Sequence, residues 1–241
     1  MKLLILSDIH GNLNALNAVL EKAGSFAPDA VALLGDIIDY GMRSDEVISV
    51  LKHCPYPVVC NIRGNHENAV IEQAYERFSS ERGKASARHT RESLSAGSWR
   101  YINENMSSNG KHEFIVGDKR FLAVHGSLCD EYWKSIFIDS DFDGYEKYDY
   151  VLSGHSHLPH YFEKYFVTDN PRTRNKKKTV FINPGSVGQP RNLNNHAQFA
   201  ILDTATEEIV LSKVEYDIGD EQKYFDGSVD EFYKNRLKDG I

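Results

Sequence analysis

The sequence predicts one α/β domain over residues 1–241, with two β-sheets and helices outside them. Short apolar runs that end in polar, glycine-containing corners recur along the chain, and such runs are typical of buried strands. Segments with helical spacing of apolar residues separate the first three runs. With 241 residues and 41% hydrophobic content, the chain is long enough to bury a substantial core.

The first 65 residues alternate between strand and helix. Apolar runs predict strands at residues 2–8, 30–36 and 57–65. Between them, the spacing of Leu13, Leu16 and Val19 predicts one helix, and a second begins near Ser44 with acidic residues in its first turn. This order favours right-handed β-α-β units, so we expect these strands to form a parallel sheet.

The segment around residues 68–105 is polar and helix-permissive, and it predicts a helical insertion of two or three helices packed over one end of the sheet. Gly83 and Gly97 are the expected breaks between these helices.

The second half of the chain returns to strands. Several are joined by short turns, which favours antiparallel or mixed pairing. A terminal helix is expected near the end, with Ser228 and Glu231 in capping-box register and Gly240 after the last turn. The strands are predicted at residues 112–117, 119–126, 148–155, 178–185, 198–203 and 208–216.

Composition excludes several classes of protein. The net charge of −7 argues against sequence-independent binding to nucleic acid. The three cysteines lack CxxC spacing, which favours reduced thiols over a zinc or redox site. The apolar N-terminal run is interrupted by Ser7 and Asp8 before it reaches signal-peptide length, and no run is long enough to span a membrane. We therefore expect a cytoplasmic protein without membrane partners.

Polar side chains that can bind metal follow the predicted strands where each one ends. In α/β sheets the functional crevice lies beyond the carboxyl ends of parallel strands, so these residues can converge on one place. The candidate donors are Asp8, His10, Asp36, Asn65, His125, His155 and His157.

This donor set indicates a pair of divalent metal ions. Oxygen and imidazole ligands without thiolate suit Mn²⁺, Fe, Co²⁺, Ni²⁺ or Zn²⁺, and Mn²⁺ is the expected ion. Two carboxylates, one amide and four histidines are more than one ion requires. Two ions about 3.5–4 Å apart that share a carboxylate use the whole set and suit in-line displacement at phosphorus.

Five ordered blocks carry a family resemblance, namely SDIHGN, GDIID, RGNHE, VHG and GHSH. Together they resemble the signature of the calcineurin-like metallophosphoesterases, and NPGSVGQPR at residues 183–191 is similar to the compact bacterial branch of that superfamily. The matching blocks run from Lys2 to about Asp203. The resemblance implies a four-layer αββα sandwich, in which two mixed sheets are flanked by helices.

The resemblance also implies a role for each residue that matches the signature. His66 matches the general acid that protonates the leaving oxygen, and Asp39 matches the carboxylate that orients it. The ligands of the first ion match Asp8, His10 and His157, the bridging carboxylate matches Asp36, and the ligands of the second ion match Asn65, His125 and His155.

The implied activity is hydrolysis of phosphomonoesters or phosphodiesters of small molecules or nucleotides by water activated at the two ions. Three alternatives stay open: an inactive scaffold on the same fold, a dinucleoside polyphosphate hydrolase and a protein phosphatase. The presence of His66 favours an enzyme over a scaffold. Tyr40 stands where protein phosphatases of the superfamily carry an arginine, which argues against a phosphoprotein substrate.

Arg191 is a candidate for binding the substrate phosphate, and Asn12 and Arg43 are weaker candidates of the same kind. The basic run at residues 171–178 lies between two strands. A solvated hairpin tip is the favoured interpretation of this run, and a phosphate or nucleic-acid patch is the alternative. The pattern does not indicate an oligomeric state.

Overall fold

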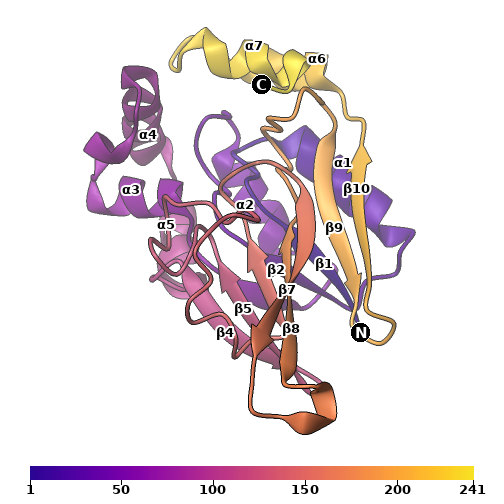
Figure 1. The fold of residues 1–241 in the computed structure, drawn as a ribbon. Coiled ribbons are helices and arrows are strands. Elements are labelled where there is room, and N and C mark those ends of the chain that lie inside the picture. The colour runs from indigo at the N-terminus through magenta and orange to yellow at the C-terminus, as the bar shows by residue number, and fades with distance from the viewer.

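The computed structural model describes residues 1–241 and has two five-stranded sheets at its centre (Figure 1). The first sheet has the order β10 (Glu208–Val214), β9 (Ala197–Asp203), β1 (Lys2–Leu6), β2 (Ala30–Leu33) and β3 (Val58–Asn61). The second sheet has the order β4 (Lys111–Val116), β5 (Lys119–Val124), β6 (Tyr150–Ser153), β8 (Lys176–Asn183) and β7 (His160–Val167).

Both sheets are mixed, and each has three parallel strands. In the first sheet β1, β2 and β3 are parallel, while β9 and β10 pair antiparallel. In the second sheet β5, β6 and β8 are parallel, and the antiparallel edge strands β4 and β7 flank them. The predicted α/β fold with two mixed sheets is confirmed.

Helices connect the strands from β1 to β4, whereas turns and loops connect the later strands. Helix α1 packs one face of the first sheet with a buried stripe of Ala15, Leu16, Val19 and Ala23. The seven helices are α1 (Leu13–Gly24), α2 (Ser44–Lys52), α3 (Asn65–Glu72), α4 (Glu81–Ser93), α5 (Ala96–Asn105), α6 (Ile218–Glu221) and α7 (Glu231–Asp239). Short 3₁₀ turns lie at Tyr75–Arg77, Pro171–Thr173 and Gln222–Tyr224.

Alternate residues of each central strand enter different cores. Leu3 and Ile5 of β1 face the second sheet, where they meet Phe121 and Leu152, whereas Leu4 packs toward the helices. This period-2 pattern fills the space between the sheets and the space under the helices at once.

The outer face of the second sheet is covered by residues 126–149, which form turns rather than helices. Tyr145, Tyr148 and Phe142 pack there against Phe181 of β8. Aromatic side chains bury enough area to cover a sheet without regular secondary structure.

Three local predictions were wrong. The last two helices of the insertion, α4 and α5, begin after Ser80 and Ser95, whose hydroxyls accept from Gly83 N and Ser98 N. Gly83 and Gly97 therefore lie in the first turns of α4 and α5 rather than at breaks between helices. The starts of these helices are set by serine, which is a preferred N-cap residue.

At the C-terminal helix, Asp230 rather than Ser228 is the N-cap, and its carboxylate accepts from Phe232 N. Gly240 ends this helix as expected, with φ of 64°. The sequence analysis also did not delimit β7, because its half-exposed edge position lacks a continuous apolar run.

The basic run at 171–178 forms the tip of the β7–β8 hairpin and the first residues of β8, and this hairpin projects from the molecule (Figure 1). Pro171 to Arg174 are exposed there. No helix of this structure combines the length and apolar character that crossing a membrane requires.

Candidate metal centre

All seven predicted donors lie just beyond the carboxyl ends of parallel strands. Asp8 follows β1 and Asp36 follows β2, while Asn65 is the first residue of α3 after β3. On the second sheet, His125 follows β5, and His155 and His157 follow β6. Because the two sheets pack face to face, these corners meet at one end of the sandwich, where His10 joins them.

The backbone at these corners adopts an unusual conformation. Asp8, His10, Asp36, His155 and His157 all have φ between 50° and 63°, the left-handed region that non-glycine residues rarely occupy. Such conformations persist where the surrounding structure enforces them, and they concentrate at functional sites. In an extended strand successive side chains point to opposite faces, whereas at these positions the left-handed residues all contribute side chains to the same clusters.

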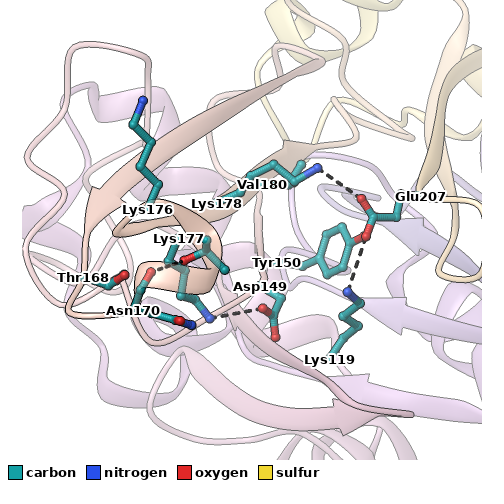
Figure 2. A pocket seen from close by; sticks show the side chains of 11 residues that line it. Lys119, Asp149, Tyr150, Thr168, Asn170, Lys176, Lys177, Lys178, Val180 and Glu207 are labelled. Carbon is teal, nitrogen blue, oxygen red and sulfur yellow. Dashed lines mark hydrogen bonds and ion pairs between the residues drawn. The ribbon is translucent and has the colours of Figure 1, made fainter.

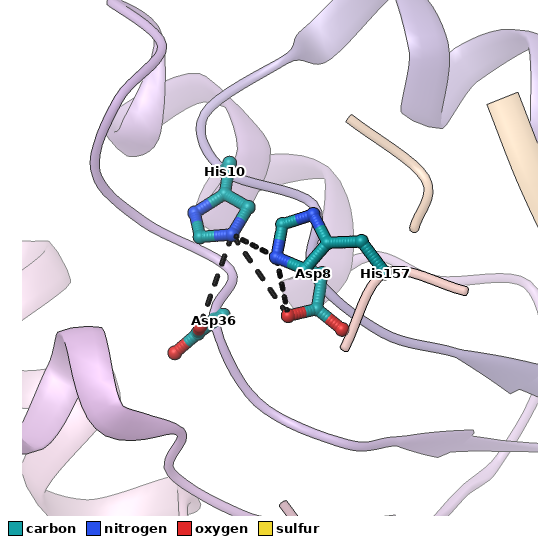
Figure 3. A group of neighbouring side chains, drawn as sticks. All are labelled: Asp8, His10, Asp36 and His157. Atoms are coloured by element: carbon teal, nitrogen blue, oxygen red, sulfur yellow. Dashed lines mark hydrogen bonds and ion pairs between the residues drawn. The ribbon is translucent and has the colours of Figure 1, made fainter. Parts of the chain in front are cut away.

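Asp8, His10, Asp36 and His157 form the first donor cluster, whose ligand atoms all lie within 4.8 Å of one another (Figure 3). His157 Nε2 is 3.1 Å from Asp8 Oδ1 and 3.3 Å from His10 Nε2. His10 Nε2 is in turn 3.7 Å from Asp36 Oδ2. The four donors thus surround one small volume.

Asp36 also belongs to the second cluster, with His125 and His155. His125 Nε2 lies 3.3 Å from Asp36 Oδ2 and 3.0 Å from Asn65 Oδ1. His155 Nδ1 lies 2.9 Å from the same Asn65 oxygen. Asp36 is shared between the two clusters, which is the position of a bridging carboxylate.

The imidazoles direct lone pairs into these two volumes. The Nδ1 atoms of His10, His125 and His157 contact backbone carbonyls at 3.2, 2.7 and 2.6 Å, and His155 Nε2 contacts a carbonyl at 3.0 Å. A carbonyl can only accept, so the proton of each neutral ring lies on that outer nitrogen. In a neutral ring the inner nitrogen then has no proton and directs its lone pair at the other donors, an arrangement that a cation stabilises.

One buried carboxylate oxygen also lacks a partner. Asp8 Oδ2 accepts hydrogen bonds from Ser7 Oγ at 2.6 Å and His155 N at 3.1 Å, whereas the buried Oδ1 accepts none. Orphaned buried polar atoms are rare in native proteins and call for a bound partner. The residues present therefore fit two divalent ions of intermediate hardness, with no thiolate in either cluster.

The pKa values of the imidazoles suit ligand roles. Burial lowers the pKa of His10 and His157 below the ordinary histidine value, and that of His155 to about 4, so these rings are neutral near pH 7. Burial also acts on His125, but the Asp36 carboxylate outweighs it and raises the pKa of His125 to about 9. A cation at this site therefore has to displace the proton of His125.

His66 stands beside the clusters without joining them. Its Nδ1 contacts Asp39 Oδ2 at 2.6 Å, and its Nε2 lies 3.8 Å from Asp36 Oδ2. Asp39 is buried, and its other oxygen accepts from Ser86 Oγ at 2.5 Å and Thr90 Oγ1 at 2.8 Å. These two hydroxyls come from successive turns of α4. The helical insertion therefore positions the Asp39 carboxylate, which in turn contacts His66.

Glu67 is a positioning residue that the sequence analysis missed. Its buried carboxylate accepts from the backbone N–H groups of Asp36, Ile37 and Gly64 at 2.8–2.9 Å. It thereby joins the corner after β2 to the start of α3. Its place in RGNHE was a usable signal, but only the fold shows what the side chain contacts.

A pocket of about 260 Å³ opens over the two clusters. One wall is formed by Phe78, whose ring packs against His66 and Trp133 at centroid distances of 5.0 and 5.2 Å. Arg77 lies over Trp133 and pairs with Asp130 at 2.7 Å, which ties the helical insertion to the 126–149 segment. No sequence pattern pointed to this wall.

The three predicted substrate-binding residues lie in different surroundings. Arg191 lines the pocket, and its buried Nε has no hydrogen-bond partner. Asn12 instead caps α1: its Oδ1 accepts from Ala15 N, and its Nδ2 donates to Gly188 O and Tyr216 Oη. These bonds use both ends of its amide, so Asn12 supports the fold rather than a ligand.

Arg43 is also directed away from the pocket. It forms an ion pair with the buried Glu221, donates to Asn14 Oδ1 at 2.8 Å and lies 3.9 Å over the ring of Tyr224. Arg43 therefore connects the start of α2 to α6, and these contacts occupy its guanidinium group.

A second pocket, of about 360 Å³, lies at the opposite end of the second sheet (Figure 2). Its lysines are mostly paired: Lys119 with Glu207 at 3.3 Å, and Lys177 with Asp149 at 3.1 Å. Lys178 also pairs with Glu207, at 3.1 Å. These ion pairs occupy Lys177 and Lys178 of the basic run, whereas its other cations, Arg172, Arg174 and Lys176, are exposed and form no ion pair.

Comparisons with known proteins agree with this geometry. Residues 1–207 match the calcineurin-like phosphoesterase superfamily domain. An uncharacterized protein of Methanocaldococcus jannaschii is 29% identical over 247 residues, covering 98% of this chain and 94% of that protein. The crystal structure of a metallophosphoesterase from Sphaerobacter thermophilus matches with a TM-score of 0.79 and 29% identity, covering 100% of both chains. An archaeal phosphodiesterase has the same fold, with a TM-score of 0.51 and 20% identity over 89% of this chain and 100% of its own.

Proposed function

Because this chain belongs to the calcineurin-like phosphoesterase superfamily, we propose that it hydrolyses phosphomonoesters or phosphodiesters of small molecules or nucleotides at two divalent metal ions. The observation that carries the proposal is the set of four imidazoles whose inward nitrogens face two buried carboxylates and one amide oxygen. A scaffold protein has no need for such a donor set, and the S. thermophilus relative is named a metallophosphoesterase.

Asp8, His10 and His157 would hold one ion, Asn65, His125 and His155 the other, and Asp36 would contact both. When bound, such ions supply Lewis acidity that lowers the pKa of water and neutralises charge on a phosphoryl group. Mn²⁺ is the first ion to test, because hard oxygen donors and imidazoles both suit it.

His66 is proposed as the general acid. Water attacks phosphorus, the bond from phosphorus to the ester oxygen breaks, and the proton on His66 Nε2 passes to that leaving oxygen. Asp39 holds the opposite ring nitrogen at 2.6 Å and so keeps Nε2 directed toward the pocket. Two features support a small substrate over a phosphoprotein: the pocket volume of about 260 Å³ and the presence of Tyr40 in its lining.

Hydrolysis of bis-p-nitrophenyl phosphate and p-nitrophenyl phosphate with added Mn²⁺ tests the proposal. We expect His66→Ala to lower kcat about 100-fold or more with its bound metal retained, since general acids contribute about 10²–10⁴-fold. Asp36→Asn should lose both metal, measured by elemental analysis, and activity.

His53→Ala is the matched control, because His53 is exposed at the C-cap of α2 and leads into the start of β3, away from the carboxyl end where the clusters lie. Wild-type protein that binds two equivalents of Mn²⁺ yet hydrolyses neither ester would favour the scaffold alternative. Phosphopeptide hydrolysis well above that of both esters would favour a protein phosphatase.

A further inference from the structure

The pocket over the two clusters has an aromatic wall on the side of His66. Phe78 and Trp133 line this pocket, and their ring centroids lie 5.2 Å apart with the ring planes at 86°. Most of the remaining lining is polar or charged, as expected for a site that holds metal ions and a phosphoryl group. A phosphoryl group alone has no use for two large apolar rings, whereas pockets for organic ligands are typically lined by such side chains. The wall therefore indicates contact with an organic part of the substrate.

The proposed general acid fixes which part of the substrate meets this wall. The leaving oxygen has to come within about 2.6–3.2 Å of His66 Nε2 to take its proton. Phe78 packs against the His66 ring in a T-shaped contact at a centroid distance of 5.0 Å, and Trp133 follows on from Phe78. Tyr40 also contacts His66, at 4.4 Å, but its ring is already stacked on Tyr233 at 4.3 Å. A group attached to the leaving oxygen therefore meets Phe78 and Trp133.

Two further contacts hold Trp133 in place. The guanidinium group of Arg77 lies 5.2 Å over the indole ring, and Asp130 pairs with this arginine at 2.7 Å. The backbone carbonyl of Trp133 accepts a hydrogen bond from His155 Nε2 at 3.0 Å, which connects the wall to a predicted metal ligand. A ring whose position is set before the ligand arrives loses little conformational freedom on binding. The wall is therefore preorganised to contact a ligand that is bound at the metal ions.

We infer that Phe78 and Trp133 form a subsite for an aromatic leaving group, and that the preferred substrates are phosphoesters whose leaving group carries a planar ring. This rests on the proposed phosphoesterase function, with His66 as its general acid. Two rings at 86° suit a third flat ring, which can stack on one of them while its edge meets the face of the other. A flat aromatic group therefore gains interactions here that an aliphatic group of the same size does not.

Binding of three phosphonates that are not hydrolysed tests the subsite. Benzylphosphonate carries an aromatic ring, cyclohexylmethylphosphonate carries an aliphatic ring of similar size, and methylphosphonate carries no ring. In calorimetric titrations of the Mn²⁺-loaded protein, benzylphosphonate should bind about tenfold or more tighter than methylphosphonate and about 3- to 10-fold tighter than the cyclohexyl compound. Trp133→Leu and Phe78→Leu should each bring the benzyl-to-cyclohexyl ratio of affinities close to one.

Trp99→Leu is the matched control, because Trp99 of α5 also lies under a guanidinium group, that of Arg91 at 5.3 Å, but does not line the pocket. It should preserve both ratios. Trp133→Leu keeps the test valid even if the buried Phe78 is needed for folding, because Trp133 is only half-buried. Elemental analysis of each variant checks that the ions are retained, as expected for Trp133→Leu, which keeps the carbonyl that contacts His155.

Tryptophan fluorescence locates the bound ring independently of affinity. The chain has two tryptophans, so Trp99→Phe leaves Trp133 as the one indole and Trp133→Phe leaves Trp99. A nitroaryl group quenches indole emission when the two are in contact. We therefore expect 4-nitrobenzylphosphonate to quench the Mn²⁺-loaded Trp99→Phe protein strongly and the Trp133→Phe protein weakly. Equal quenching of the two proteins would place the ring elsewhere and overturn the subsite.

The phosphonate analogue of adenosine 5′-monophosphate separates two sources of the aromatic ring. It carries its ring beyond a ribose, whereas benzylphosphonate carries its ring one carbon from phosphorus. Tighter binding of the adenosine compound that is lost in Trp133→Leu would identify nucleotides as the substrates. Tighter binding of benzylphosphonate with the same dependence would identify simple aryl esters, and either result supports the subsite.

The outcomes separate the subsite from the proposed function. A benzyl-to-methyl ratio near one in the wild type, or a benzyl-to-cyclohexyl ratio unchanged in both wall variants, would overturn the subsite even if simple esters are hydrolysed. Ratios that depend on Phe78 and Trp133 support the subsite even if no ester is hydrolysed, in which case only the proposed reaction fails.

Discussion

His66 and Asp39 determine the pH dependence that we expect of the proposed activity. Burial favours the neutral ring of His66, but the charges of Asp36 and Asp39 outweigh it and raise the pKa of His66 above the ordinary histidine value. A general acid works only while it holds its proton. Activity that depends on His66 is therefore present below this raised pKa and is lost as the pH rises through it.

Replacing Asp39 with asparagine should shift that loss to lower pH. The amide keeps the shape of the side chain but removes the negative charge that stabilises the imidazolium. We expect the alkaline limb of kcat/KM to move to lower pH and activity at pH 8 to fall about 10- to 100-fold. Asp118→Asn, in the exposed β4–β5 turn, should leave the profile unchanged. An alkaline limb that stays in place in Asp39→Asn would mean that another group supplies the proton.

At the scale of elements, one polar face of helix α4 forms hydrogen bonds to Asp39, which contacts His66. Ser86 and Thr90 are one turn apart, and both hydroxyls donate to Asp39 Oδ1. The hydrophobic residues of the insertion, Phe78 and Ala87 among them, join the core beneath α1 and α2. The same packing that stabilises the insertion therefore sets the position of the carboxylate behind His66.

Thr90→Val tests how strongly this helix is tied to Asp39. Valine has nearly the shape of threonine but cannot donate a hydrogen bond, so it leaves the buried carboxylate with one donor fewer. Hydrogen bonds to charged groups contribute about 1.5–3 kcal/mol, and we expect the free energy of unfolding in urea to fall by about that amount. Thr206→Val, in the exposed turn between β9 and β10, should change it by less than about 0.5 kcal/mol. An equally small effect of Thr90→Val would show that Asp39 does not depend on α4.

At the scale of the whole molecule, the two clusters connect the two sheets. Asp8 and Asp36 belong to the first sheet, whereas His125 and His157 belong to the second. Without a cation, Asp8 Oδ1 is buried without a hydrogen-bond partner at the interface of the sandwich, and the neutral imidazoles direct unshared lone pairs into the same volume. Bound metal should therefore stabilise the packing of the two sheets and raise the free energy of unfolding of the whole domain.

Thermal unfolding with and without metal measures this effect. A ligand at about 100 times its dissociation constant stabilises by about 2.7 kcal/mol, which corresponds to a Tm increase of about 5–10 °C for a domain of this size. We expect Mn²⁺ to raise Tm by this amount relative to protein in EDTA, and Asp8→Asn to abolish most of the rise. A Tm that is the same in Mn²⁺ and in EDTA would argue against ions at the interface of the sheets.

The sequence by itself determined the fold class and the candidate donors. Apolar runs of strand length predict buried strands, and a polar residue directly after such a run lies just beyond the carboxyl end of its strand. This local rule was enough to bring Asp8, Asp36 and His125 into one expected site, because parallel strands end on the same side. It needed no knowledge of contacts between distant segments.

Tertiary structure alone decided which polar residues are free to bind a ligand. Asn12 and Arg43 have the right chemistry for phosphate, yet packing against distant residues occupies them. Phe78 and Trp133 had no pattern to mark them, although the fold brings Phe78 against His66 and Trp133 against Phe78. The physical reason is that hydrogen bonds and ion pairs depend on which segments meet in the folded chain, whereas strand and helix patterns depend on neighbours along it.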